Sequence, residues 1–325
     1  MVHKVNSERE QRGKKGVREI AGSVEIGISL AGLTLRNPTM PASGVLGTSA
    51  SILRKVADSG AGALVTKSVG PIARAGYPNP TVIQVEGGLL NAVGLANPGI
   101  NEFCEEIEGL SDLGIPIISS VYGFSPEEYA ETARKAEECG SNAIELNLSC
   151  PHVKGAGAEM GRDPNIVESI VRDVRESVSI PLLVKLTPNV ANIADLAVVC
   201  ASSGADAITA VNTFKAMAID VETCRPVLAN KFGGLSGGAI KPLALRCVYD
   251  IFEAVDIPII GCGGIMTWED AVEFILAGAS AVQIGSAIAF GEMSIFRSIC
   301  KGLDSYLKRK GYRNVRDIIG LVHRI

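Results

Sequence analysis

The chain has 325 residues and a formal net charge of −4, and 47% of its residues are hydrophobic while 20% are charged. These values are typical of a globular protein with a large core, and no apolar run approaches the roughly 18 residues that a membrane-spanning helix requires. The acidic balance and the 5% aromatic content argue against a nucleic-acid partner, because phosphate binding favours a basic face and single strands favour aromatic platforms. We therefore expect a soluble protein that binds a small molecule, with no membrane partner.

The eight cysteines are scattered along the chain, and none lies in a C-x-x-C pair. This spacing predicts neither a metal site nor an iron–sulfur cluster. Most of these cysteines lie in apolar segments, and the start of the sequence has no secretory hydrophobic region. We therefore expect reduced thiols packed in the core of a cytoplasmic protein, with a set of disulfides as the alternative.

Residues 1–22 carry six Lys or Arg against three Glu and have few apolar side chains. Such a segment cannot bury enough surface to become ordered, so we predict a flexible basic tail, with a targeting segment as the alternative. Residues 24–38 alternate around Ala31-Gly32 as two short strands do, which predicts a β-hairpin at the bottom of the following domain. We expect residues 23–325 to form one domain.

From residue 39 onward the chain repeats a short apolar run, a polar or glycine-rich turn, and a segment of helical periodicity. This order is typical of βα units. Eight units without a break in composition predict an α/β fold with a single (β/α)8 TIM barrel, and an open doubly wound sheet is the alternative. The predicted strands are residues 39–43, 63–68, 116–122, 143–149, 181–187, 207–213, 258–263 and 281–285.

Helix boundaries can also be predicted. The segment 125–128 (S-P-E-E) has a capping serine and a proline in the first turn, and Cys139-Gly140 is a typical helix end. Asn165, Asn192 and Thr267 are predicted to begin further helices.

The stretch A-I-E-L-N-L-S-C-P-H, residues 143–152, predicts a strand that ends in polar side chains. Asn147 follows the period of two, and Pro151 stops the strand, so Cys150 lies where the strand becomes a loop. The glycine-rich loop 153–162 is typical of an active-site flap. A buried, inert thiol is the alternative for Cys150.

Glycines after the last two predicted strands indicate an anion site. Gly263 and Gly264 follow strand seven, and Gly285 and Ser286 follow strand eight. Glycine lets backbone N–H groups approach an anion closely, and this is where barrels bind phosphate. Two ordinary tight turns are the alternative.

Two lysines lie within otherwise apolar strands, Lys67 and Lys185. A buried ammonium is costly unless it meets an anion, although the side chain could instead extend to solvent. The loops 91–99 and 233–238 are rich in small residues and amides. Such loops suit a flat, polar heterocycle held by several hydrogen bonds.

Several of these segments together resemble the dihydroorotate dehydrogenases. The motifs are N-A-V-G-L-A-N-P-G, E-L-N-L-S-C-P, V-K-L-T-P-N, R-P-V-L-A-N, G-G-L-S-G and I-K-P, and the resemblance runs from about residue 24 to the end. The segment 219–230 is most similar to the class 1B, NAD-linked catalytic subunits. This resemblance implies oxidation of (S)-dihydroorotate to orotate on FMN, in de novo pyrimidine (UMP) biosynthesis.

The resemblance also implies roles for individual residues. Cys150 would be the general base that removes the C5 proton while hydride leaves C6 for flavin N5, and Lys185 would lie near the flavin N1/O2 edge. The implied substrate-binding residues are Lys67, Asn91, Ala92, Val93, Gly94, Leu95, Asn147, Asn212 and Thr213. The implied FMN-binding residues are Ser43, Lys67, Ser68, Ser120, Asn147, Lys185, Val211, Gly237, Gly263, Gly264, Gly285 and Ser286.

Three positions depart from the pattern of the family, namely His152, Ser120 and Gly238, where the family usually has Asn, Asn and Pro. Ser120 is shorter than an amide, so we expect one flavin contact to be lost or made through water.

The sequence has no G-x-G-x-x-G fingerprint and no cysteine cluster, so we expect that the chain cannot pass electrons to NAD by itself. The resemblance to the class 1B subunits implies a partner subunit that carries FAD and a [2Fe–2S] cluster, in a heterotetramer of two catalytic and two electron-transfer chains. The alternatives are the fumarate-linked class 1A enzyme, a dihydropyrimidine dehydrogenase, a flavin-dependent tRNA-modifying enzyme and a non-catalytic binding protein.

Overall fold

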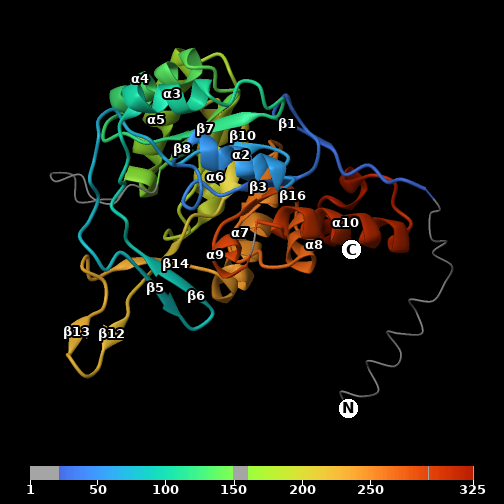
Figure 1. The fold of residues 1–325 in the computed structure, drawn as a ribbon. Helices are drawn as coiled ribbons and strands as arrows, with labels where there is room; N and C mark the ends of the chain where they lie inside the picture. Colours follow the sequence, from blue (N-terminus) through green and yellow to red (C-terminus); the bar gives the residue numbers. More distant parts are fainter. Residues whose placement is uncertain (1–21, 149–159, 292, 325) are drawn as a thin grey trace.

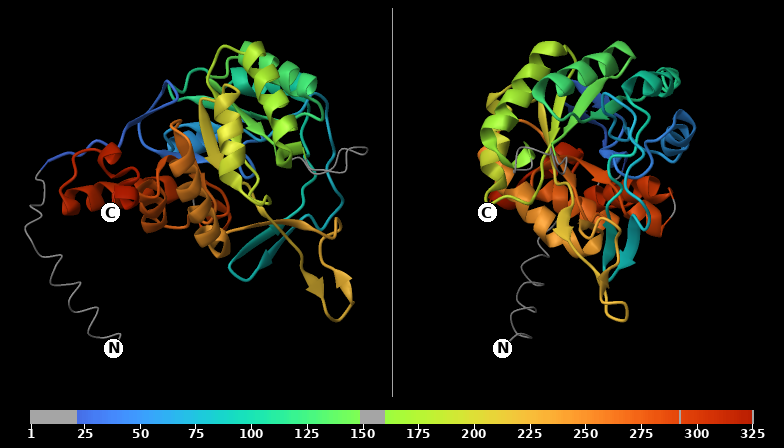
Figure 2. Two further views of the ribbon diagram at one scale, coloured as in Figure 1. Left: turned by 180° about the vertical axis from the view of Figure 1, so that it is seen from behind. Right: turned by 90° about the vertical axis from the view of Figure 1, so that its left-hand side faces the viewer.

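A computed structural model describes residues 22–148, 160–291 and 293–324. Residues 1–21 of the predicted basic tail, Cys150, His152 and most of the predicted flap lie outside these ranges. Within them, the chain forms a parallel barrel with helices on its outside (Figure 1, Figure 2).

Eight parallel strands form the barrel, and they correspond one by one to the predicted strands. They hydrogen-bond in the order β3-β16-β15-β10-β9-β8-β7-β4, and the ring closes where the Gly62 backbone N–H donates to the Thr39 carbonyl at 2.7 Å. The predicted (β/α)8 barrel is confirmed. The strands are β3 (Thr39–Pro41), β4 (Leu64–Val65), β7 (Ile117–Val121), β8 (Ala143–Asn147), β9 (Leu182–Lys185), β10 (Ala207–Ala210), β15 (Ile259–Cys262) and β16 (Ala279–Ile284).

The helices pack around the strands with their apolar faces inward, as period-3.6 patterning requires. They are α2 (Ala50–Asp58), α3 (Ile100–Glu108), α4 (Pro126–Glu138), α5 (Pro164–Ser177), α6 (Ile193–Ser202), α7 (Lys241–Ala254), α8 (Trp268–Leu276), α9 (Ala287–Phe290) and α10 (Ile295–Lys310). Short 3-10 turns lie at η1 (Met160–Arg162), η2 (Gly238–Ile240), η3 (Val315–Ile318) and η4 (Leu321–Arg324).

Most predicted helix starts are confirmed. Ser125 Oγ accepts from the Glu128 N–H before α4, and the side chains of Asn192 and Thr267 cap α6 and α8. The predicted start at Asn165 is wrong, because the carboxylate of Asp163 caps α5 and Pro164 is its first residue. Proline suits that position, since a first-turn N–H has no partner within the helix.

The predicted N-terminal hairpin is confirmed as β1 (Ile28–Leu30) and β2 (Leu33–Leu35), which pair antiparallel. Its turn residues Ala31 and Gly32 both have positive φ, at 49° and 83°, as a two-residue hairpin turn requires. The buried side chains of the hairpin share one apolar cluster with inward residues of the barrel, Met40, Val65, Ile118, Ala143, Leu183, Ala207, Ile260 and Ala281. The hairpin therefore closes the N-terminal end of the barrel.

The two long segments expected as loops after the second and sixth strands contain strands of their own. They form a four-stranded antiparallel sheet in the order β11-β14-β6-β5 and a separate β12-β13 hairpin, which extend from the barrel together (Figure 1, Figure 2). β6 and β14 contain glycine, which has low β-propensity, and these two strands pair although 143 residues separate Asn91 from Gly234. The strands are β5 (Val82–Val85), β6 (Gly88–Asn91), β11 (Phe214–Ala216), β12 (Ile219–Asp220), β13 (Arg225–Pro226) and β14 (Gly233–Ser236).

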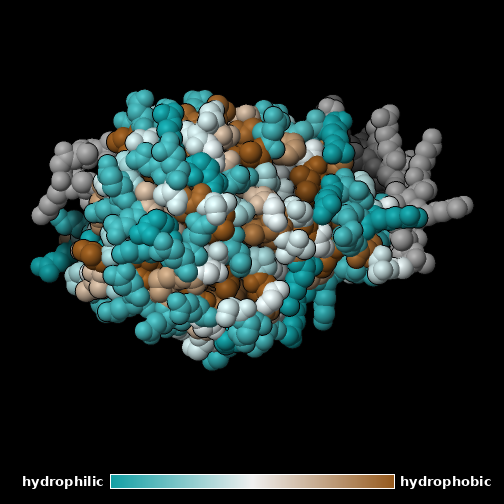
Figure 3. Space-filling model, turned by 90° about the horizontal axis from the view of Figure 1, so that it is seen from above, coloured by the Kyte–Doolittle hydropathy of each residue, from teal (hydrophilic) through white to brown (hydrophobic). Residues whose placement is uncertain are grey.

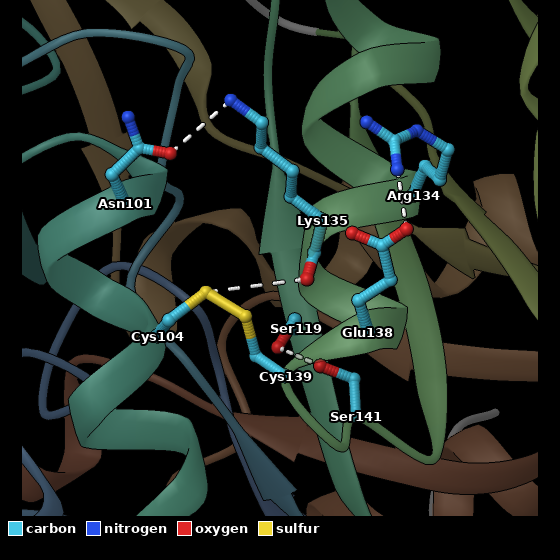
Figure 4. The surroundings of a disulfide bond; sticks show 8 residues. All are labelled: Asn101, Cys104, Ser119, Arg134, Lys135, Glu138, Cys139 and Ser141. Carbon is cyan, nitrogen blue, oxygen red and sulfur yellow. Dashed lines mark hydrogen bonds and ion pairs between the residues drawn. A yellow bond between two sulfur atoms is a disulfide. The ribbon is translucent and has the colours of Figure 1, made fainter.

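The expectation of reduced, core-packed thiols is wrong in two places. Cys104 of α3 and Cys139 at the end of α4 form a disulfide, although 35 residues separate them (Figure 4), and Cys224 is exposed. The pairing depends on the packing of two helices, which cysteine spacing does not encode. Cys200 does fit the expectation, since it is fully buried and burial raises the pKa of its thiol to about 12.

The surface carries no broad apolar band on the face shown in Figure 3, where hydrophilic residues surround small, separate hydrophobic areas. Among the residues that the structure describes, no helix is both long and apolar enough to cross a bilayer. In the same part of the chain, no three His, Cys, Asp or Glu side chains are grouped as ligands for a metal ion.

Candidate active site

The C-terminal ends of the barrel strands bring the predicted polar residues to one mouth. Asn147, the last residue of β8, lies opposite Lys185, the last residue of β9, and Asn212 and Thr213 follow β10. Parallel strands in register place their carboxyl ends at the same edge. The alternation that the sequence predicted therefore delivers these side chains to a common site.

A chain of hydrogen bonds joins four of the predicted site residues. Ser120 Oγ and Ser68 Oγ are 2.8 Å apart. Asn147 Nδ2 donates to Ser68 Oγ at 3.0 Å, and Asn212 Nδ2 donates to Asn147 Oδ1 at 3.2 Å. These contacts join Ser120 of β7 and Asn147 of β8 to the segments that follow β4 and β10, so the four side chains form one polar wall.

The extra sheet brings Asn91 to this wall. Asn91 lies opposite Gly234 in the β6–β14 pair, and its Nδ2 donates to the Gly234 carbonyl at 3.1 Å. A Cβ atom on Gly234 would lie only 2.0 Å from Thr213 Oγ1. Glycine is required there, because it lets β14, the strand that pairs with β6, approach Thr213 closely.

The loop that contains Ala92, Val93, Gly94 and Leu95 is half-buried, and backbone hydrogen bonds to residues 77 and 81 and one side-chain amide hold it in place. Gly94 and Leu95 both have positive φ, at 77° and 58°. Asn97 Nδ2 donates to the Leu95 carbonyl at 2.7 Å and to the Tyr122 hydroxyl at 2.6 Å. Asn97 and Tyr122 were not predicted as site residues. Only the N-P-G sequence that begins at Asn97 signals such a turn.

Lys67 follows β4 and is half-buried. Burial lowers the pKa of its ammonium below the usual value of 10.5. In the described ranges no carboxylate is paired with this side chain. A desolvated cation without a counter-charge suits an anionic ligand.

Lys185 lies inside the barrel, where it is 3% exposed. Its Nζ donates to Gln283 Oε1 at 2.7 Å and lies 4.0 Å from Glu145 Oε1. The sequence prediction named neither Glu145 nor Gln283. Both are polar residues at inward positions of β8 and β16, and that position was a signal that could have identified them.

The predicted phosphate residues lie at the ends of two paired strands. Gly263 follows Cys262 of β15, which lies opposite Gln283 of β16, and Gly285 and Ser286 follow β16 directly. A Cβ atom on Gly264, whose φ is 77°, would lie 2.6 Å from the backbone nitrogen of Lys241. Glycines at the ends of these two strands let backbone N–H groups approach an anion closely, so this position fits a phosphate group.

The remaining predicted flavin residues border the same mouth. Ser43 is buried two residues after β3, which pairs with β16. Val211 is buried directly after β10. Gly237, with φ of 106°, lies directly after β14, where a Cβ atom would come 2.5 Å from the Gly88 Cα. Backbone donors, hydroxyls and two lysines around one mouth are a donor set that fits FMN.

Comparison with known proteins gives a direct answer about the family. The model of the dihydroorotate dehydrogenase family matches residues 26–307, which is most of the chain. The chain belongs to the dihydroorotate dehydrogenase family. This is the family that the sequence motifs resemble, and the expectation is confirmed.

Curated dihydroorotate dehydrogenases align over almost the whole chain. The relatives from Methanosarcina mazei and Pyrococcus furiosus are each 50% identical to it, over 91% and 93% of this chain and 95% and 100% of their own lengths. A relative from Methanocaldococcus jannaschii is 44% identical over 93% of this chain and 99% of its own. All three are named dihydroorotate dehydrogenase B (NAD(+)), catalytic subunit.

One departure from the pattern of this dehydrogenase family has a visible consequence. Ser120 is fully buried, and its hydroxyl contacts Ser68. The shorter side chain therefore remains part of the polar wall through Ser68. Cys150, the predicted base, and His152 lie outside the described residues.

Proposed function

We propose that this chain oxidises (S)-dihydroorotate to orotate with bound FMN, as the catalytic step of de novo pyrimidine biosynthesis in the cytoplasm. The observation that carries the proposal is the hydrogen-bonded wall of Ser68, Asn147 and Asn212, with Asn91 and Lys67 at the same mouth. Amides and an ammonium from four separate segments match a flat pyrimidine with a carboxylate.

FMN would be held by the glycines, hydroxyls and lysines that lie around the mouth of the barrel. Gly263, Gly264, Gly285 and Ser286 would take its phosphate through backbone N–H groups. The remaining proposed contacts are Ser43, Lys67, Ser68, Ser120, Asn147, Lys185, Val211 and Gly237. FMN, when bound, supplies a two-electron acceptor for hydride.

The side chains of the protein would bind the substrate and move its proton. Lys67 would pair with the substrate carboxylate, and Asn91, Asn147, Asn212 and Thr213 would hydrogen-bond to the ring, with residues 92–95 completing the cradle. Cys150 would accept the C5 proton as a thiolate, since a proton beside a carbonyl requires a positioned base. Cations near a thiol favour its thiolate, so a cysteine can serve close to neutral pH.

We also propose NAD as the final acceptor, reached through a second subunit with FAD and a [2Fe–2S] cluster in a heterotetramer. The support is the name of the relatives, which are dihydroorotate dehydrogenase B (NAD(+)) catalytic subunits. The sequence also lacks a dinucleotide fingerprint. A self-sufficient, fumarate-linked enzyme is the second candidate, because it would use the same barrel and base.

The test begins with the visible spectrum of the purified chain before and after addition of dihydroorotate. A flavin spectrum that bleaches with dihydroorotate is expected, and a colourless or unresponsive protein would contradict the proposal. Electron transfer is then assayed with an artificial dye, with NAD⁺ and with fumarate. Reduction of the dye alone is expected. NAD⁺ reduction by the pure chain would refute the two-subunit arrangement, and rapid fumarate reduction would favour the second candidate.

A further inference from the structure

A polar layer lies inside the barrel, between the apolar plug and the mouth. Ala143, Leu183, Ala207 and Ala281 belong to the apolar cluster that contacts the hairpin. Strand residues two positions further on face the same way. Those residues are Glu145, Lys185, Thr209 and Gln283, all of them buried.

The four polar side chains of this layer contact one another. Gln283 Nε2 donates to Glu145 Oε2, and Thr209 Oγ1 donates to the same oxygen at 3.0 Å. The opposite end of the Gln283 amide accepts from Lys185 Nζ at 2.7 Å. The amide of Gln283 thus links a carboxylate to an ammonium, with its oxygen toward the cation and its nitrogen toward the anion.

The second carboxylate oxygen has a different environment. Glu145 Oε1 is buried and has no hydrogen-bond partner in the described part of the chain. It lies 4.0 Å from Lys185 Nζ. Glu145 is fully buried, and a buried carboxylate is stable only near a compensating charge. Both hydrogen bonds to the Glu145 carboxylate come from donor groups. This is expected for an ionised carboxylate, which can only accept hydrogen bonds.

We propose that Glu145 is a positioning residue that holds the Lys185 ammonium through Gln283 and offsets its charge, so that it sets the reduction potential of the bound flavin. The inference rests on the proposed FMN site. A cation beside the flavin favours the electron-rich reduced form, and a nearby carboxylate weakens that effect. Glu145 and Gln283, one layer below the mouth, would therefore control a property of the cofactor without touching the substrate.

Two substitutions with opposite charge changes test the inference. Glu145→Gln keeps the shape but removes the negative charge, so the midpoint potential of bound FMN should rise, by at least a tenfold change in the reduction equilibrium, which is about 30 mV for two electrons. Gln283→Glu adds a negative charge and should lower the potential. A purely structural role would not give shifts of opposite sign.

The matched control is Asp206→Asn, another carboxylate-to-amide change. Asp206 pairs with Arg175 at 2.8 Å, just before β10 and thus at the N-terminal end of the barrel. This variant should lose stability but keep the parental potential. Potentials are titrated with dithionite and reference dyes, and FMN dissociation constants are measured by fluorescence quenching.

The outcomes separate this inference from the proposed function. The parental holoprotein tests the proposed function through its spectrum with dihydroorotate, whereas the titrations need no substrate. The role of Glu145 would be overturned if the reduction equilibrium constants of FMN in Glu145→Gln and Gln283→Glu, calculated from their midpoint potentials, stay within threefold of the parental constant. Loss of FMN by both variants, with retention of FMN by Asp206→Asn, would also overturn the role of Glu145. In that case the polar layer would serve to bind FMN through Lys185 and not to balance the charge of Lys185.

Discussion

The amide of Asn147 donates to Ser68 Oγ at 3.0 Å, although 79 residues separate the two in the chain. The same amide group accepts from Asn212 Nδ2 on its oxygen side. Because both ends of the Asn147 side chain are engaged, its amide orientation is set before any ligand binds. Such preorganisation reduces the cost of ordering side chains on binding.

Asn147 and Asn212 should therefore act as a unit in ligand binding. We expect the losses of orotate affinity in Asn147→Ala and Asn212→Ala to be non-additive in the double variant, with a coupling free energy of about 0.5–3 kcal/mol. Calorimetric titration with orotate measures the cycle. Ser119→Ala is the control, since the Ser119 hydroxyl contacts Ser141 and lies outside the wall. Additive losses would contradict the preorganised pair.

Cys150→Ala should retain FMN and bind orotate, yet its flavin should be reduced by dihydroorotate about 10²- to 10⁴-fold more slowly, as expected for loss of a positioned base. Stopped-flow absorbance measures this rate. Cys224→Ala, which changes an exposed thiol, is the control and should keep the parental rate. Parental reduction by Cys150→Ala would show that another group removes the proton.

The free energy of unfolding should depend on pH through Lys67. Burial lowers the pKa of its ammonium below 10.5, so the unfolded chain binds this proton more tightly. The Lys67 contribution to the free energy of unfolding is therefore unfavourable below its folded pKa and recovers as the pH rises from there toward 10.5. Lys67→Met should raise the thermal midpoint of the apo-protein at neutral pH and remove this recovery.

The same substitution should weaken orotate binding by about 10- to 100-fold, the usual loss for a hydrogen bond to a charged group. Orotate affinity of the parental protein should fall as Lys67 is deprotonated at high pH. Lys55→Met, which changes an exposed lysine on α2, is the control for both measurements. Unchanged orotate affinity in Lys67→Met would remove Lys67 from the substrate site.

Gly264→Ala should reduce FMN content, because a Cβ atom there would lie 2.6 Å from the Lys241 nitrogen and would displace the backbone of the phosphate site. Gly114 also has a positive φ, 63°, but no atom lies within 4 Å of a Cβ atom on it. Gly114→Ala should cost about 1 kcal/mol in unfolding free energy and leave FMN content unchanged. The flavin-to-protein absorbance ratio distinguishes the two, and equal ratios would argue against a phosphate at Gly264.

The Cys104–Cys139 disulfide should be detectable by thiol counting. Protein denatured without reductant should expose two fewer thiols than protein denatured with it. Cys104→Ser should lower the free energy of unfolding by about 2–4 kcal/mol under oxidising conditions, whereas Cys224→Ser should change it little. Equal thiol counts with and without reductant would show that the two cysteines are reduced in solution.

The sequence by itself determined most of the elements and indicated most of the candidate site residues. The eight strands, the hairpin and the caps at Ser125, Asn192 and Thr267 were predictable, because period, turn chemistry and capping are local properties. The family motifs extended this to individual side chains. Asn165 shows the usual limit, since Asp163 and Asn165 both cap helices well and only the backbone conformation decides between them.

Only the tertiary structure decided which side chains contact one another. Ser68, Asn147 and Asn212 join through strand order, and the sheet that brings Asn91 to Gly234 pairs residues 143 apart in the chain. The interior pairing of Glu145 with Gln283 spans 138 residues. The physical reason is that local patterns specify which face of an element is buried, whereas barrel closure and strand register specify what that face contacts.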